Sequence, residues 1–170
     1  QLLKQGVAVG LGTDGEKENN NLDLFEEMKT ASLLAKFSNL DAAALDSWSV
    51  CQMATRDGAR ALGLEQQIGS IEVGKQADLI VVNTATPRMT PLINQGSLFN
   101  LHTNLVHAVQ GQDVVMTMVA GKVLVKNGQL LNADLQQFID QINFAAPALF
   151  KRRSDWLSLR GAAVNELQRT

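Results

Sequence analysis

The fold is decided by one short stretch, Val7-Ala8-Val9-Gly10-Leu11-Gly12-Thr13-Asp14-Gly15. Its first five residues are apolar or glycine, the composition of a strand that is buried on both faces. Gly12 and Gly15 flank one acid, and glycines allow a tight turn that leaves the Asp14 carboxylate at the carboxyl end of the strand. In α/β folds, ligands bind at that end. Asp14 is therefore a candidate to bind a metal or move a proton, and the alternative is that it only caps a turn.

A helix is expected after a polar loop, Glu16-Lys17-Glu18-Asn19-Asn20-Asn21, which is long enough to line the mouth of a pocket. Asp23 and Glu26 have the spacing of a capping box. Apolar residues then recur at helical spacing, which predicts a buried face: Leu24, Met28, Ala31 and Ala35. The charged residues Glu26, Glu27 and Lys29 are expected on the solvated side.

A second helical segment is expected to begin at Ser47 as its cap, to be interrupted at Gly58 and to stop at Gly63. The small residues Ala54, Gly58 and Ala61 would let this segment approach a neighbour closely. Cys51 lies within it, and no motif that lowers a thiol pKa surrounds it. A small apolar role is therefore favoured for Cys51 over that of a nucleophile.

Strand patterns replace helical ones after Leu64. In the segment Ile68–Val82, apolar and polar residues alternate, a turn follows at Gly74, and an apolar strand comes after it. Asp78, just before that strand, is expected to make a buried structural hydrogen bond. A hairpin is predicted for Asp113–Leu130, where Asn127-Gly128 supplies a second tight turn. An amphipathic helix is expected from Asp134, broken near Pro147.

Composition narrows the functional classes. The formal net charge of −2 gives no electrostatic footprint for nucleic acid or for an anionic membrane. The single cysteine cannot form an internal disulfide, which is consistent with a reducing, cytoplasmic location. The first residues, Gln1–Gly6, are typical of the last turn of a helix, and no initiator Met precedes them. We therefore expect the chain to be the carboxyl-terminal portion of a longer protein.

The two histidines, His102 and His107, do not have the spacing of a helical ligand pair. Two histidines also cannot complete a zinc site, which needs three or four protein ligands. A structural role is favoured for both, and contact with the pocket from its far side stays open for His102.

The motif Gly12-Thr13-Asp14-Gly15, followed by Asn19-Asn20 and Leu22–Met28, resembles the last barrel strand and following helix of the amidohydrolase superfamily. The branch it resembles contains the methylthioadenosine/S-adenosylhomocysteine deaminases and the triazine chlorohydrolases. The phrases at Ala54–Leu64 and Ile68–Val82 are similar to the final barrel helix and the return to a small sandwich in that family.

The resemblance implies an α/β fold: the end of a (β/α)8 TIM-type barrel, part of a small β-sandwich and a carboxyl-terminal helix. The implied domains are 1–66 for the barrel end, 67–131 for the sandwich segment and 132–170 for the helical extension. Asp14 matches the residue that sits beside the catalytic metal and handles the proton of the attacking water. Asp14 is thus the implied catalytic and metal-binding residue, and Glu18 and Asn19 are the implied substrate contacts.

The implied activity is metal-dependent hydrolytic deamination of a purine-type ring, in an adenosine derivative such as S-adenosylhomocysteine or methylthioadenosine. One divalent metal is implied, zinc or alternatively iron, with its histidine ligands and the Glu proton shuttle in an absent amino-terminal portion. The implied partners are a small nitrogen heterocycle, that missing portion and further copies in a homo-oligomer.

Two alternatives stay open. One is a chlorohydrolase or other aminohydrolase acting on guanine or a triazine, and the other is a non-catalytic homologue that acts as a binding module. The loop departs from the deaminase pattern at Glu16-Lys17-Glu18, where those enzymes typically carry Ala-Ala-Ser. That departure bears on the substrate more than on the type of reaction.

Overall fold

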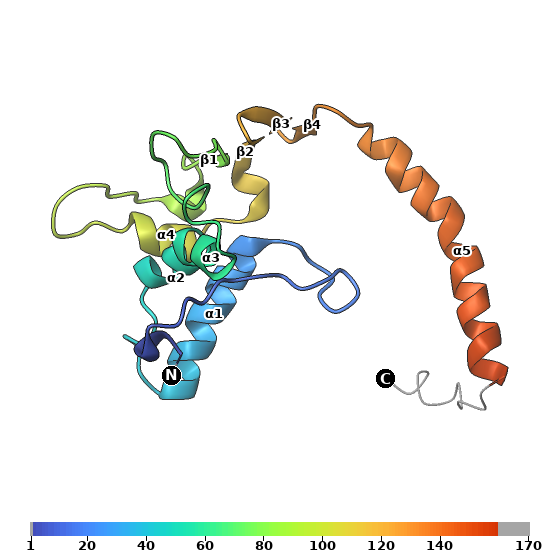
Figure 1. The fold of residues 1–170 in the computed structure, drawn as a ribbon, viewed down its shortest axis with the longest axis horizontal. Coiled ribbons are helices and arrows are strands. Elements are labelled where there is room, and N and C mark those ends of the chain that lie inside the picture. The colour runs from blue at the N-terminus through green and yellow to red at the C-terminus, as the bar shows by residue number, and fades with distance from the viewer. Residues whose placement is uncertain (1, 160–170) are drawn as a thin grey trace. The chain divides into compact units, whose positions relative to one another are not determined.

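The protein is described by a computed structural model that covers residues 2–159. The described residues form two compact units, residues 2–131 and residues 132–159. The elements of the first unit are, in order, η1 (Leu3–Gln5), α1 (Leu24–Asn39), α2 (Ser47–Met53), α3 (Arg56–Ala61), β1 (Leu79–Val82), η2 (Pro87–Met89), α4 (Leu101–His107), η3 (Gly111–Asp113), β2 (Val114–Val119), β3 (Lys122–Lys126) and β4 (Gln129–Leu130) (Figure 1). The second unit contains the long helix α5 (Leu135–Leu159).

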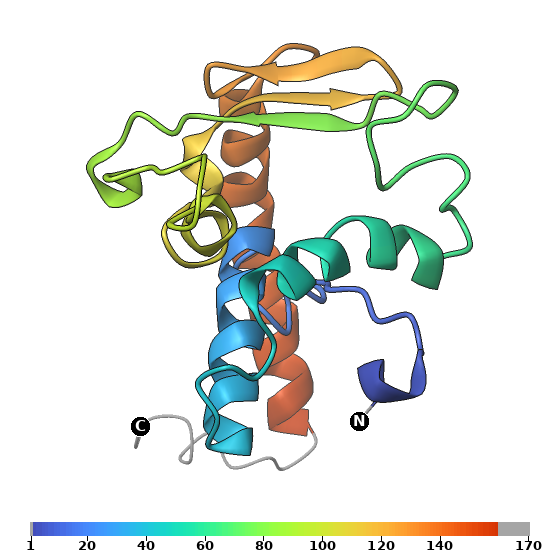
Figure 2. The same ribbon diagram turned by 90° about the vertical axis from the view of Figure 1, so that its left-hand side faces the viewer.

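The strands form one antiparallel sheet in the order β1-β2-β3-β4, seen with its strands side by side in Figure 2. The turn between β2 and β3 places Ala120 and Gly121 at φ 48° and 78°, and the next turn places Asn127 and Gly128 at 51° and 75°. Two successive positive φ values match the right-handed twist of a hairpin. The hairpin predicted from Asn127-Gly128 is therefore confirmed.

Asp78 makes the structural hydrogen bond that the sequence predicts, but not in a buried site. Its Oδ1 accepts from the backbone N–H of Ala120 at 2.7 Å, although the residue is exposed. The bond joins the residue before β1 to the β2–β3 turn, which explains why an acid precedes this strand.

The core of the first unit joins three helices. Met28 of α1, Val50 of α2 and Val106 of α4 are buried against one another, and Leu11 and Phe25 pack on them. In α1 the buried positions are Met28 and Ser32, whereas Leu24 is exposed. The predicted face is thus correct at Met28 and wrong at Leu24. The reason is that α1 packs against α2 and α4 through residues beyond its first turn, whereas Leu24 is the first residue of the helix.

Only half of the predicted capping box forms. Asp23 is the N-cap of α1, and its Oδ1 accepts from the N–H of Phe25 at 2.9 Å. Glu26 does not reach back to the cap and instead accepts from the side-chain amide of Asn21. The second bond of a capping box, from the Asp23 N–H to the Glu26 carboxylate, does not form because this N–H donates to Asn21 Oδ1 at 3.0 Å.

The second helical segment begins and breaks at positions other than the predicted ones. Its N-cap is Asp46, which accepts from the N–H of Ser49 at 3.1 Å, so Ser47 is the first helical residue rather than the cap. The interruption lies at Thr55, with φ −130° and ψ −95°, and Gly58 sits inside α3. Gly58 instead packs closely: a Cβ on Gly58 would lie 3.0 Å from the carbonyl oxygen of Met53, and a Cβ on Gly10 would lie 3.0 Å from the Cα of Gly58.

Residues 7–11 were predicted to form a buried strand, and this is not what the described residues show. The segment is extended but pairs with no strand between residues 2 and 159, and Val7 is 45% exposed. One backbone hydrogen bond, from Leu11 N–H to the Met53 carbonyl at 3.4 Å, joins it to α2. A parallel strand needs neighbouring strands, and the sheet of this chain is antiparallel and lies elsewhere in the sequence.

Helix α5 runs from Leu135 to Leu159 without a break, so the predicted interruption at Pro147 is wrong. Proline removes one backbone donor, but the alanines around it, at 145, 146 and 148, are the strongest helix formers. Within residues 2–159, no helix has both the length and the apolar character needed to cross a membrane.

A pair of glycines tests the packing of α3. Gly69 and Gly74 have nearly the same positive φ, 92° and 95°, but a Cβ on Gly69 would lie 2.6 Å from the Cβ of Ala59, whereas Gly74 faces open space. Gly74→Ala should cost about 1–3 kcal/mol through backbone strain alone. Gly69→Ala should cost about 1–3 kcal/mol more through overpacking. Thermal and urea unfolding of both variants measure this, and equal losses would contradict the packing shown here.

Candidate functional site

The Asp14 turn is fixed by its own backbone. Asp14 has φ 59°, the left-handed region that Asp tolerates better than most residues, and its side chain is exposed. Its Oδ1 accepts from the N–H of Gly15 at 2.8 Å, and the Thr13 hydroxyl donates to the Asp14 carbonyl at 3.2 Å. The turn thus depends on a positive φ at Asp14 itself, and the prediction that Gly12 and Gly15 provide it is wrong. One oxygen of the carboxylate thus accepts a local hydrogen bond, and the side chain is open to solvent.

Asn19 ties this turn to helix α1. Its Nδ2 donates to the Thr13 carbonyl at 3.0 Å and to Glu27 Oε1 at 2.8 Å, and Asn19 and Glu27 are both partly buried. The expectation that Glu27 lies on the solvated face is therefore wrong, because its carboxylate is needed as the acceptor for Asn19. The described contacts of the Asn19 amide nitrogen are with Thr13 and Glu27, so Asn19 positions the Asp14 turn.

The loop between Asp14 and α1 presents its charges to solvent. Glu16, Lys17 and Glu18 are all exposed, and Lys17 Nζ lies 3.2 Å from Glu18 Oε1. The N–H groups of Glu18 and Asn19 both donate to the Gly15 carbonyl, at 3.0 and 2.8 Å, which closes a tight turn. This turn leaves the three charged side chains on the outside and directs Asn19 inward.

The described residues supply one candidate ligand for a metal and not a full set. Among residues 2–159, no group of three or more His, Cys, Asp or Glu side chains is gathered as a metal centre would require. The Asp14 carboxylate suits a divalent cation by its chemistry and exposure. The fit is therefore partial, with Asp14 as one ligand.

The two histidines lie in other surroundings. The His102 ring is 4.5 Å from the Trp48 ring and 4.9 Å from the Phe99 ring, which places it in an aromatic cluster. Burial lowers the pKa of the His107 imidazole, and the positive charges of Lys36 and Lys29 lower it further. His107 is consequently neutral near pH 7.

Cys51 packs against the core formed by Met28, Val50 and Val106. Burial raises the pKa of its thiol, and the negative charge of Asp46 raises it further. A protonated thiol is a poor nucleophile, in agreement with the apolar role expected from the sequence.

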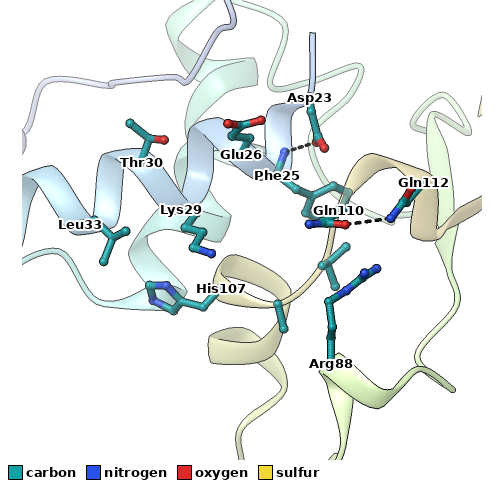
Figure 3. A pocket seen from close by; sticks show the side chains of 12 residues that line it. Asp23, Phe25, Glu26, Lys29, Thr30, Leu33, Arg88, His107, Gln110 and Gln112 are labelled. Carbon is teal, nitrogen blue, oxygen red and sulfur yellow. Dashed lines mark hydrogen bonds between the residues drawn. The ribbon is translucent and has the colours of Figure 1, made fainter. Parts of the chain in front are cut away.

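Two cavities of the first unit do not include the Asp14 turn in their lining. One, of about 740 Å³, is lined by residues of α1, α4 and η3, with Lys29, Arg88 and His107 among its polar groups (Figure 3). The other, of about 840 Å³, is mainly apolar and is lined by residues of α1, α2, β1 and β2. Neither is lined by Asp14, Glu18 or Asn19. Cavity size therefore does not locate the site, and the candidate rests on the chemistry of the Asp14 turn.

Asp23 fixes the start of α1. Besides capping α1, its Oδ2 accepts from the N–H of Gly111 at 2.7 Å, across 88 positions of sequence. Nearby, Arg88 Nη2 contacts both oxygens of the buried Asp113, at 2.7 and 2.8 Å. Burial raises the pKa of Asp113, but the hydrogen bond from Gln110 and the charge and hydrogen bond of Arg88 outweigh it and leave the pKa below its usual value. Asp23 and Asp113 therefore have structural roles.

Comparison with known proteins defines the class. Residues 1–124 match the amidohydrolase family model, and the chain belongs to that family. A 5'-deoxyadenosine deaminase from Methanosarcina acetivorans is 45% identical over 152 residues, which cover 89% of this chain and 33% of that protein. A 5-methylthioadenosine/S-adenosylhomocysteine deaminase from Syntrophus aciditrophicus is 39% identical over 142 residues, 84% of this chain and 31% of its own.

A solved structure agrees in fold. The crystal structure of an adenosine deaminase from Xanthomonas campestris with bound zinc is 35% identical, has a TM-score of 0.81, and is matched over 88% of this chain and 33% of its own. The chain thus spans about a third of the length of these relatives. Its helices and antiparallel sheet correspond to part of an amidohydrolase structure.

The Asn19 bridge can be tested against its neighbour. Asn19→Ala removes the donor that Thr13 and Glu27 share, and should lower the free energy of unfolding by about 1–3 kcal/mol because two partly buried acceptors lose their partner. Asn20→Ala alters an exposed position and should stay within about 0.5 kcal/mol of the wild type. Urea unfolding compares them, and an Asn19→Ala effect as small as that of Asn20→Ala would contradict the bridging role.

Proposed function

We propose that this chain is the carboxyl-terminal third of a hydrolase that removes an amino group from the purine-type ring of an adenosine derivative. One observation carries the proposal: the exposed Asp14 carboxylate, which accepts from the Gly15 N–H, in a chain whose relatives at 39–45% identity are adenosine-derivative deaminases. In the complete protein, residues 7–11 would form the last strand of a TIM-type barrel, which gives their apolar side chains the neighbours that the described residues lack. The proposed domains are 1–66, 67–131 and 132–170.

The chemistry assigns Asp14 a proton-transfer role. A divalent metal, zinc as in the related structure, would lower the pKa of a bound water when present. Asp14 would contribute one ligand and accept a proton from the attacking water. It would then hand that proton toward the leaving amine, which departs as ammonia.

Asn19 and Glu18 would act in different ways. Asn19 holds the Thr13 carbonyl and so keeps the Asp14 turn in place, and its part in substrate recognition would be exercised through that turn. Glu18 lies at the exposed rim with Glu16 and Lys17, where it would meet the far end of the substrate.

The role of Asp14 predicts a large and specific loss of turnover. In the complete protein, Asp14→Asn keeps the shape of the side chain but removes the proton acceptor, so kcat should fall by about 1,000-fold or more. Metal content should remain largely unchanged, since the proposed histidine ligands would hold the ion. Steady-state rates and metal analysis on one preparation give both values.

Asp41→Asn is the matched control. Asp41 is also an exposed acid, and its Oδ1 also accepts from a nearby backbone N–H, that of Ala43 at 2.8 Å. This variant should keep wild-type turnover. An Asp14→Asn rate within tenfold of the wild type would show that Asp14 does not transfer the proton.

The charged rim predicts a substrate preference. An amino-acid tail such as that of adenosylhomocysteine can pair with Glu16, Lys17 and Glu18, whereas a methylthio group cannot. Exposed pairs contribute about 0–1 kcal/mol each, so two such pairs should favour the charged tail in kcat/KM by no more than about 30-fold. Replacing all three residues by Ala should reduce this preference.

An ammonia assay across adenosine, methylthioadenosine, adenosylhomocysteine, guanine and chlorotriazines, with chloride measured in parallel for the last, tests the substrate class. Activity on guanine or a triazine but on none of the adenosines would move the protein to another branch of the family. A fully folded protein that binds these compounds but turns over none of them would favour the binding-module alternative.

A further inference from the structure

Asn19 holds the Asp14 turn from both sides. Its side-chain nitrogen donates to the Thr13 carbonyl at 3.0 Å, and its backbone N–H donates to the Gly15 carbonyl at 2.8 Å. The Thr13 carbonyl belongs to the planar peptide group that joins Thr13 to Asp14. Fixing the plane of that group restricts rotation about the N–Cα bond of Asp14, where φ is 59°. The side-chain bond of Asn19 therefore supports the left-handed conformation of Asp14.

Glu27 selects the orientation of the Asn19 amide. Its Oε1 accepts from the same Asn19 nitrogen at 2.8 Å, so the two N–H groups of that nitrogen serve Thr13 and Glu27. Both partners are acceptors. If the amide were turned around, Asn19 Oδ1 would face a carbonyl oxygen and a carboxylate oxygen, and these partly buried acceptors would lose their donor. The Glu27 carboxylate therefore favours the orientation in which Asn19 holds Thr13.

Glu27 itself is carried by the core of the first unit. It lies in α1 one position before Met28, which is 6% exposed and belongs to the same core as Val50 and Val106. A side chain on a packed helix is held more precisely than one on a loop. The contacts that run from Glu27 through Asn19 to Thr13 all lie within one continuous segment, residues 13–27.

The neighbouring Glu26 has the same chemistry without this connection. It also accepts from the side-chain amide of a loop asparagine, Asn21, but it is exposed. Asn21 Oδ1 in turn accepts from the Asp23 N–H at 3.0 Å, at the start of α1. The Glu26–Asn21 pair thus connects the loop to its own helix, whereas the Glu27–Asn19 pair reaches the residue before Asp14.

We propose that Glu27 is a positioning residue for the proton transfer by Asp14. It orients the Asn19 amide, the amide holds the Thr13 carbonyl, and the turn then presents the Asp14 carboxylate to the attacking water. This inference rests on the proposed function, in which Asp14 accepts a proton from that water. Glu27 acts through Asn19, so its loss should lower kcat and leave KM nearly unchanged.

Steady-state kinetics of the complete protein test this role. Glu27→Ala removes the acceptor and should lower kcat by about 10- to 100-fold, with KM within about threefold of the wild type, as is typical when a residue that orients a ligand of a metal site is lost. Glu27→Gln keeps a side-chain oxygen that accepts from Asn19 without the charge, and should stay within about fivefold in kcat. Glu26→Ala, the matched control, should leave kcat and KM unchanged.

A double variant tests whether Glu27 acts through Asp14. In an Asp14→Asn background, Glu27→Ala should cause no further loss of kcat, because the group that it positions is already absent. A full additional loss in that background, an equal loss in Glu26→Ala, a loss carried by KM alone, or a Glu27→Gln variant as slow as Glu27→Ala would each overturn the proposal.

Hydrogen exchange separates this inference from the proposed function. The N–H groups of Gly15, Glu18 and Asn19 are bonded within the turn. Glu27→Ala should therefore speed their exchange by roughly threefold or more, and Glu26→Ala should not. Thermal unfolding checks that both variants fold. Unchanged exchange in Glu27→Ala would overturn the role of Glu27, whatever the enzyme acts on. Faster exchange in a protein that turns over none of the nucleosides would refute the proposed function, and with it the catalytic part of this proposal, while supporting the hold of Glu27 on the turn.

Discussion

The close contact between Gly10 and Gly58 is the constraint on which the position of the candidate site depends. A methyl group on Gly10 would lie 3.0 Å from the Gly58 Cα, so the extended segment and helix α3 meet this closely only because Gly10 carries no side chain. This contact, with the hydrogen bond from Leu11 to Met53, sets Leu11 against the core of Met28, Val50 and Val106. Asp14 follows three residues later, and its place is therefore set by packing that lies outside its own loop.

The loop is in turn anchored to the same core. Asn19 connects the Thr13 carbonyl to Glu27, which lies one position before the buried Met28 of α1. Asp23 caps the same helix and also accepts from Gly111, so the start of α1 is held from two directions. The Asp14 turn is therefore attached to the core while its carboxylate stays accessible to solvent.

Several elements could be predicted from local sequence because local chemistry decides them. The Asn127-Gly128 hairpin follows from the positive φ of its turn, and Asp23 caps α1 through a bond to a residue two positions away. Others could not. The helix breaks at Thr55 and not at Gly58, and Glu27 is a partly buried acceptor and not a surface acid, because Asn19 of the preceding loop donates to it.

Short contiguous motifs were enough to identify the family, the acid at the end of the 7–11 segment and the polar loop after it, because each of these features depends on neighbouring residues alone. The tertiary structure alone decided that Asp14 takes the left-handed turn itself, that Asn19 supports it through Glu27, and that α5 continues through Pro147. The physical reason is that hydrogen-bond partners and packing distances are set when segments far apart in the chain meet. Residue type and spacing fix only what each segment can offer at that meeting.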